Sequence, residues 1–137
     1  MSKNVLVTGG CGFIGSHIVD HLIKKKFNVT ILDLISPKRK DVKFIKGNVL
    51  NKSLVQRSLK NINFIFHLAA VSDVNKVKNI PSKTIETNIL GTTNLLEAAR
   101  KKNIKRFIFA SSYYSYGEAG NLYTTSKTAS ELVIKNY

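Results

Sequence analysis

Short runs of apolar residues alternate along the whole chain with longer stretches in which apolar residues recur at helical spacing. Several of the short runs are almost entirely apolar, as is typical of parallel strands that helices cover on both faces. The longer stretches carry apolar residues three and four positions apart, the spacing of one face of a helix. The predicted strands lie at 5–8, 28–33, 42–46, 63–67 and 106–110. The predicted helices lie at 13–26, 54–59, 81–101 and 123–137.

This alternation of strand and helix predicts an α/β fold. Repeated β-α units with short connections form right-handed crossovers, which place helices on both faces of a doubly wound parallel sheet. The simplest strand order for such a sheet is 3-2-1-4-5. The 137 residues fit one domain, which we expect to span positions 1–137. Because the last predicted helix stops at Tyr137 without a capping residue or a following strand, we also expect this domain to be truncated.

Composition excludes several classes of protein. Hydrophobic residues make up 43% of the chain, too many for a disordered protein. No apolar run approaches the roughly 20 residues that cross a bilayer, so we expect no membrane partner. The formal charge of +14 suggests a nucleic-acid partner, but the basic clusters at 24–26 and 100–102 close predicted helices. The cluster at 38–40 has no interleaved aromatic residues for base stacking, and we therefore expect no nucleic-acid partner.

A glycine-rich segment, TGGCGFIG at 8–15, joins the first predicted strand to the first predicted helix. Its glycines at 9, 12 and 15 suit a tight turn, close approach of a pyrophosphate to the backbone, and close packing of helix against strand. The helix start, with the amides of Phe13 and Ile14, offers positive partial charge to the phosphates. A glycine-rich turn without a ligand is the alternative, but the strand–turn–helix context favours a dinucleotide site of the Rossmann type.

Asp33 ends the second predicted strand, about 20 residues beyond the glycine loop. A carboxylate at that place can hydrogen-bond both ribose hydroxyls of an adenosine, and it would repel a 2′-phosphate. NAD is therefore the expected cofactor, in preference to NADP. The basic residues at 38–40 lie just downstream and would weaken this preference. The alternative interpretation of Asp33 is an ordinary aspartate at the end of a strand.

Tyr123 and Lys127 are four positions apart, and so lie on one face of the last predicted helix. An ammonium near a phenol favours the phenolate, so we expect Lys127 to lower the pKa of Tyr123 from its usual value of about 10. Tyr123 could then act as general base or acid on a substrate hydroxyl. Ser112, just past the fifth predicted strand, can hydrogen-bond the same oxygen. Taken alone, the pair could equally be a surface tyrosine beside a solvated lysine.

Together with the glycine loop, four segments resemble the extended short-chain dehydrogenase/reductase family, which includes UDP-glucose 4-epimerase and nucleotide-sugar dehydratases. They are FHLAA at 66–70, TNILGT at 87–92, FASS at 109–112 and YTTSK at 123–127. The resemblance implies an NAD-dependent epimerase or dehydratase that acts on a nucleotide-activated sugar through transient hydride transfer. Tyr123 would be the base, Lys127 would also bind the nicotinamide ribose, and Ser112 would polarise the substrate.

The same resemblance assigns further positions to the cofactor site: Asn48, Val49, Leu68, Ala69, Ala70 and Asn88. The family usually has an aspartate where Asn48 stands, which leaves that contact to the adenine open, although an amide offers both a donor and an acceptor. Core packing is the alternative role for the two alanines. His67 is interpreted as a structural histidine at the end of a strand.

No metal site is expected. His17 and His21 are four positions apart on a predicted helix, but no third ligand accompanies them, so a helix surface is the better interpretation. Cys11 is the single cysteine of the chain and cannot form an internal disulfide. This cysteine usage favours a cytoplasmic protein.

The family resemblance implies a homodimer formed through the long helix predicted at 81–101 and the helix that begins at Tyr123. It also implies a C-terminal substrate domain, which is missing from the predicted elements. The segment between Ser112 and Tyr123 is shorter than in the 4-epimerases, which leaves the sugar open. Two alternatives remain: an NAD(P)-dependent reductase of the same family, and a dinucleotide-binding module without catalysis.

Overall fold

The computed structural model describes residues 3–116 and 120–137, which contain a five-stranded parallel sheet. The strand order is β3-β2-β1-β4-β5, and the predicted fold and strand order are confirmed. Residues 117–119, within the short segment between Ser112 and Tyr123, lie outside the described residues. The strands are β1 (Asn4–Thr8), β2 (Asn28–Asp33), β3 (Lys43–Lys46), β4 (Phe64–His67) and β5 (Arg106–Phe109).

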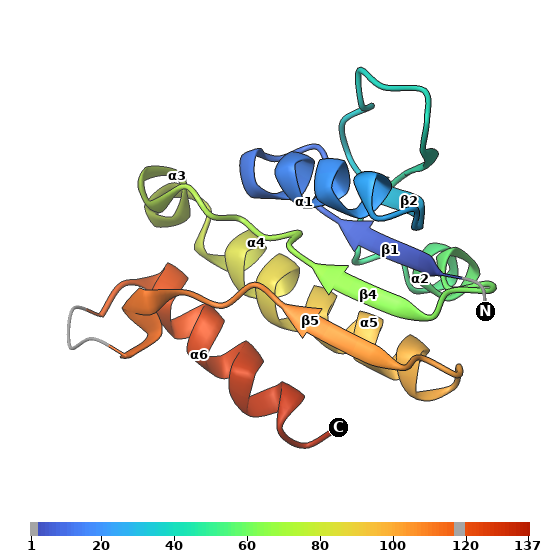
Figure 1. Cartoon of the computed structure of the whole chain (residues 1–137). Coiled ribbons are helices and arrows are strands. Elements are labelled where there is room, and N and C mark those ends of the chain that lie inside the picture. Colours follow the sequence, from blue (N-terminus) through green and yellow to red (C-terminus); the bar gives the residue numbers. More distant parts are fainter. Residues whose placement is uncertain (1–2, 117–119) are drawn as a thin grey trace.

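Helices follow the strands and cover both faces of the sheet. Figure 1 shows α1 on one side of the strands and α5 on the other. The α-helices are α1 (Phe13–Lys24), α2 (Lys52–Ser58), α3 (Val74–Asn79), α4 (Pro81–Ile85), α5 (Gly91–Arg100) and α6 (Leu122–Ile134). A π-helical turn, η1 (Glu86–Leu90), joins α4 to α5, and a 3-10 turn, η2 (Tyr113–Tyr116), follows β5.

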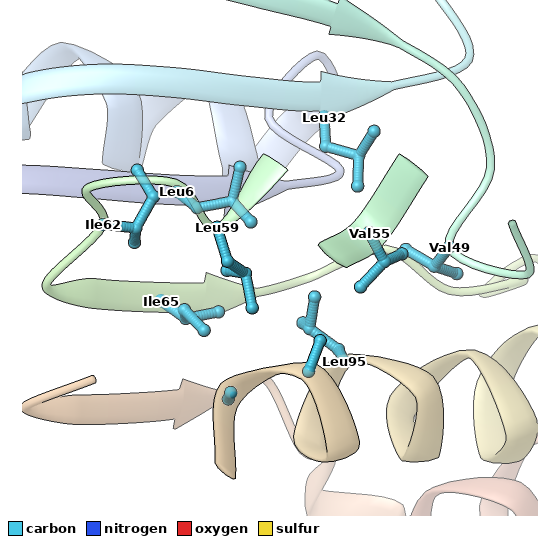
Figure 2. Packing of buried hydrophobic residues seen from close by; sticks show 10 residues of the cluster. Leu6, Leu32, Val49, Val55, Leu59, Ile62, Ile65 and Leu95 are labelled. Atoms are coloured by element: carbon cyan, nitrogen blue, oxygen red, sulfur yellow. The ribbon is translucent and has the colours of Figure 1, made fainter. Parts of the chain in front are cut away.

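Alternate residues of β1 pack into two cores on opposite faces of the sheet. Val5 and Val7 pack with Val19 and Leu22 of α1. Leu6 points to the other face, beneath α2 and α5, into the cluster that Figure 2 shows: Leu32, Val49, Val55, Leu59, Ile62, Ile65 and Leu95. Each fully buried aliphatic side chain of this kind stabilises the fold by on the order of 2 kcal/mol. The two cores fix the sheet, and its carboxyl edge carries the site.

The segment between β4 and α5 differs from the prediction. Helix α3 was not predicted, because it is short and buries only one apolar side chain, that of Val77. Its start is stabilised by Asp73, whose side chain accepts hydrogen bonds from the amides of Asn75 and Lys76. The single helix predicted at 81–101 is divided by the π-helical turn. A smaller difference is the end of α1 at Lys24, since Lys26 adopts a positive φ of 61°.

Within residues 3–116 and 120–137, no helix is both long and apolar enough to cross a membrane. Nor do these described residues gather three or more His, Cys, Asp or Glu side chains that could hold a metal ion.

Candidate functional site

A pocket of about 480 Å³ opens at the carboxyl edge of the sheet, between the glycine loop and the start of α6. Two of the predicted site residues, Ser112 and Asn88, do not line this pocket. All the others do: Gly9, Gly12, Phe13, Ile14, Gly15, Asp33, Asn48, Val49, Leu68, Ala69, Ala70, Tyr123 and Lys127. The fold therefore joins the glycine loop and the tyrosine–lysine pair in one cavity.

The glycine loop is held in a tight turn by its own backbone. Gly9 has a φ of 71°, a region that favours glycine, and the amide of Gly12 donates to the Gly9 carbonyl at 3.1 Å. A Cβ on Gly15 would lie 2.1 Å from the Gly9 carbonyl oxygen, so any side chain there would collide with backbone. A Cβ on Gly12 would meet only that same oxygen, at 3.3 Å. Gly15 is thus required for packing, whereas Gly12 leaves space towards the pocket.

The start of α1 presents unpaired amides to this pocket. Gly12 is the N-cap, no side chain caps the helix, and the first turn contains no acidic residue. In the described part of the chain, the amides of Phe13, Ile14 and Gly15 find no acceptor outside the helix. Such a helix start combines free N–H donors with the positive end of the helix dipole, which suits a phosphate.

Asp33, at the end of β2, lies beside the glycine loop and binds backbone amides with both carboxylate oxygens. Oδ2 accepts from the amide of Cys11 at 2.9 Å, and Oδ1 accepts from that of Ile35 at 3.1 Å. These bonds orient the carboxylate at the pocket wall, where lone pairs that the protein does not use can accept from a ligand hydroxyl. Burial, with Asp33 nearby, raises the pKa of the Cys11 thiol to about 11, so Cys11 remains protonated and is a poor nucleophile.

Arg39, one of the three basic residues at 38–40 that were expected to weaken the preference for NAD, is paired with two carboxylates outside the pocket. Arg39 forms ion pairs with Asp20 of α1 and with Asp41, the latter through Nε at 2.7 Å. These hydrogen bonds raise the pKa of the Arg39 guanidinium above its ordinary range. Arg39 therefore spans from the loop after β2 to α1, and its charge is already matched by two carboxylates.

His67 is a structural histidine, as the sequence suggested. It is fully buried, and its pKa is lowered to about 3, first by burial and then by the charge of Lys127. Thr92 Oγ1 donates to the carbonyl of Asn88 at 2.6 Å, so it can only accept at His67 Nε2, at 2.9 Å. Nε2 therefore carries the proton, and Nδ1 accepts from Thr8 Oγ1 at 2.7 Å. Thr8 Oγ1 in turn accepts from the amide of Ala69, which fixes the pocket wall.

Asn88 is a positioning residue behind the pocket. It is 2% exposed and lies in the π-helical turn. Its Oδ1 accepts from the amide of Val71 at 2.7 Å, and its Nδ2 donates to the Val71 carbonyl and to Ser126 Oγ, at 3.1 and 2.8 Å. Ser126 Oγ then donates to the carbonyl of Tyr123 at 2.7 Å. Asn88 thus ties the wall after β4 to the helix that carries Tyr123.

Tyr123, Lys127 and Ser112 lie together beyond β5. Lys127 Nζ donates to the carbonyl of Ala110 at 2.8 Å and lies 4.7 Å from the ring centroid of Phe109. The same nitrogen lies 5.8 Å from the ring centroid of Tyr123. Ser112 forms a side-chain hydrogen bond with the phenol of Tyr123. Ser112 therefore meets the tyrosine oxygen although it does not line the pocket.

The expected lowering of the tyrosine pKa is wrong for this structure. Burial raises the pKa of Tyr123 above its usual value, and the hydrogen bond with Ser112 offsets only part of this rise. The cause lies in the position of the ammonium, which is held at the carbonyl of Ala110 and beside the tyrosine ring. Lys127 itself is 3% exposed, and burial lowers its pKa from 10.5 to about 8.

One known family matches nearly the whole chain. A family model, described as the NAD-dependent epimerase/dehydratase family, matches residues 5–137. This chain belongs to the NAD-dependent epimerase/dehydratase family. The resemblance noted in the sequence is thereby confirmed.

Relatives of known structure have the same fold. A UDP-glucose 4-epimerase from Thermotoga maritima, solved with UDP-glucose, has 33% identity and a TM-score of 0.89, and the match covers 97% of this chain and 50% of that one. The Bifidobacterium longum UDP-glucose 4-epimerase, solved with NAD+ and UDP, has 30% identity and a TM-score of 0.89. This match covers 97% of this chain and 48% of that one. A UDP-N-acetyl-alpha-D-glucosaminuronate decarboxylase of Bacillus cytotoxicus is 38% identical over 126 residues, which are 86% of this chain and 39% of the relative. The chain spans half or less of the length of these relatives.

Several pocket residues of this family member were missed in the sequence analysis. They follow β2, β3, β4 and β5 or lie on α4 and the π-helical turn: Leu34, Ile35, Gly47, Val71, Ser72, Lys83, Thr87, Ala110 and Ser111. Residues that directly follow parallel strands could have been found from the rule that ligands bind at the carboxyl ends of such strands. No such rule covers Lys83 and Thr87, because their place depends on the path of the chain between β4 and α5.

The buried Lys127 makes stability depend on pH. Its pKa is about 8 in the folded chain and 10.5 without burial, so between these values the unfolded chain binds a proton that the folded chain has lost. The free energy of unfolding therefore rises with pH in that interval. Relative to Lys127→Met, the wild type is expected to gain about 3 kcal/mol between pH 7 and about pH 11. Urea denaturation at several pH values measures this difference.

The matched control for this experiment is Lys135→Met, since Lys135 is exposed at the end of α6. Its difference from the wild type is expected to stay constant over the same pH range. A constant difference for Lys127→Met as well would contradict the prediction.

Proposed function

We propose that residues 1–137 form an NAD-binding domain, and that this domain takes part in an epimerase- or dehydratase-type reaction on a nucleotide-activated sugar. One observation carries the proposal: Tyr123 and Lys127 line the same pocket as the glycine loop and Asp33. A dinucleotide site and a proton-transfer pair in one cavity suit a reaction that couples hydride transfer to deprotonation of a hydroxyl.

The residues present fit the proposed cofactor. Asp33 offers carboxylate lone pairs to the ribose hydroxyls of the adenosine half, and the free amides of α1 receive the diphosphate. Asn48 and Val49 line the same end of the pocket as candidates for the adenine. At the other end, Tyr123 and Lys127 would meet the nicotinamide half. NAD, when bound, accepts a hydride from the sugar and returns it.

The chain's own residues would handle the proton. Tyr123 removes the proton from a sugar hydroxyl and later returns it, since its phenol is the titratable oxygen at this end of the pocket. Ser112 shares a hydrogen bond with that phenol and orients it. Lys127 places an ammonium beside the ring, 5.8 Å from its centroid, and donates to the carbonyl of Ala110. Burial raises the pKa of Tyr123 and the hydrogen bond with Ser112 offsets part of that rise, so Ser112 is the neighbour that favours the phenolate.

The relatives support a UDP-sugar as the substrate class. The Thermotoga maritima and Bifidobacterium longum epimerases contain UDP-glucose and UDP, respectively. The Bacillus cytotoxicus relative is named as a decarboxylase of a UDP-sugar acid, so relatives at this level of identity differ in the reaction and share the UDP group.

Nucleotide binding tests the proposal directly. Isothermal titration calorimetry is expected to show NAD binding, with NADP bound at least about tenfold more weakly because Asp33 repels the 2′-phosphate. Asp33→Asn is expected to narrow that difference, whereas Asp73→Asn, which changes the cap of α3 outside the pocket, should leave it unchanged. Absence of NAD binding by the wild type would refute the proposal.

We also propose a homodimer formed by the helical segment at 81–101 and by α6. Both leave apolar side chains exposed: Ile85 at 36%, Leu90 at 46% and Leu132 at 55%. Burying such side chains against a second copy is favourable, at roughly 25 cal/mol per Å². Light scattering coupled to size exclusion should give a dimer for the wild type and for the control Val74→Glu, and a monomer for Leu132→Glu. A monomeric wild type would refute this proposal.

A further inference from the structure

Lys83 is a basic residue of the pocket that no motif predicted. It lies in the last turn of α4, is exposed, and lines the pocket together with Thr87, which follows it by four positions. Figure 1 shows α4 and the start of α1 at the same end of the sheet, beyond the arrowheads of β1 and β4. Within the described residues, Lys83 forms no ion pair and no side-chain hydrogen bond.

The other charged groups of the pocket have partners. Asp33 binds two backbone amides, and Lys127 donates to the carbonyl of Ala110 from a buried position. Among residues 3–116 and 120–137, no other Asp, Glu, Lys or Arg lines the pocket. Of the two lysines that line this cavity in the described chain, Lys83 is therefore the exposed one without a hydrogen-bond partner.

The glycine loop lacks a basic side chain of its own. From position 8 to position 16 the chain contains no lysine or arginine. The α1 dipole supplies only about half an elementary charge at the helix start. A diphosphate carries roughly two negative charges, so helix amides alone leave much of its charge unmatched. A lysine on a flexible stem at the pocket wall can supply the missing positive charge.

We infer that Lys83 binds the diphosphate group of a nucleotide held in this pocket. The inference rests on the proposed function, because it assumes a nucleotide in the cavity. A diphosphate group in this pocket has two sources, the dinucleotide and a UDP-sugar. Lys83 acts in both cases as a point charge, without selecting the base.

Calorimetry with Lys83→Met tests this assignment. For the whole chain, the Kd is measured for ADP-ribose, NAD and UDP, and for adenosine and uridine, which lack phosphate. Lys83→Met is expected to raise the Kd of the three diphosphate ligands roughly tenfold and to leave the Kd of both nucleosides unchanged. The salt dependence of binding should also fall for the variant, since one ionic contact is lost. Lys78→Met, on the exposed surface of α3 and outside the pocket, is the matched control with an unchanged Kd for every ligand.

The outcomes separate the possibilities. Weaker binding of ADP-ribose and NAD by the variant assigns Lys83 to the cofactor diphosphate. Weaker binding of UDP alone assigns it to the substrate diphosphate. Equal binding of every ligand by Lys83→Met and the wild type overturns the inference, while the proposed function stands. An equal loss of nucleoside binding also overturns the inference, because the substitution would then have changed the structure of the pocket. A wild type that binds none of these ligands overturns the proposed function and the inference together.

Discussion

Gly15→Ala is expected to lower the free energy of unfolding by about 3 kcal/mol or more and to abolish NAD binding. The added Cβ would lie 2.1 Å from the carbonyl oxygen of Gly9 and 2.9 Å from the Cα of Gly10. Both contacts are with backbone, so no side-chain rotation can relieve them. The start of α1 must then move away from β1, which removes its amides from the pocket. Urea denaturation and calorimetry with NAD measure the two effects.

Gly12→Ala is the matched control in the same loop. Its Cβ would meet only the carbonyl oxygen of Gly9, at 3.3 Å, and the φ of Gly12 is −74°, which alanine adopts without strain. Its stability is expected to stay within about 1 kcal/mol of the wild type. NAD binding should still weaken, since the methyl group would stand where a diphosphate approaches the backbone. A Gly15→Ala variant as stable as Gly12→Ala would contradict this account of the loop.

The sheet could be predicted because its strands are short apolar runs that contrast clearly with their neighbours. The glycine loop and the pair of Tyr123 and Lys127 could be predicted because each is a local motif whose spacing fixes its geometry. Their meeting in one pocket follows from the topology, since parallel strands of one sheet end at the same edge.

The segment from 71 to 90 could not be predicted, for reasons of tertiary structure. The π-helical turn coincides with hydrogen bonds from Asn88 to Val71 and Ser126, which are 17 and 38 positions away in sequence. Helical periodicity cannot reveal such partners, so the sequence indicated one continuous helix. The same limitation hid Lys83, which lies on α4 in this segment and lines the pocket.

The raised pKa of Tyr123 has a similar cause. Spacing predicts that Lys127 lies on the same helix face, and this holds in the structure. The degree of burial and the carbonyl of Ala110, which holds the ammonium, depend on how α6 packs against β5. A motif therefore identifies the reacting pair, whereas the protonation equilibrium of that pair depends on the surrounding fold.

Tyr123→Phe is expected to lower turnover about a thousandfold while the Kd for NAD changes by less than about twofold. The substitution removes the phenolic oxygen that would take the sugar proton and keeps the ring in its half-buried position on α6. Hydride transfer cannot proceed far if the hydroxyl proton has no acceptor, so the loss should appear in kcat. The measurement is the rate at which UDP-glucose is converted, followed by chromatography of the nucleotide-sugars, with calorimetry for the Kd.

Tyr113→Phe is the control for this substitution, because Tyr113 is 89% exposed and does not line the pocket. It removes the same oxygen atom from the same residue type and is expected to leave both turnover and the Kd unchanged. Wild-type turnover retained in Tyr123→Phe would assign the proton transfer to another group. A loss of NAD binding as large as the loss of turnover would instead make Tyr123 a binding residue, because its hydroxyl would then stabilise the cofactor complex and a separate role in proton transfer would not be needed.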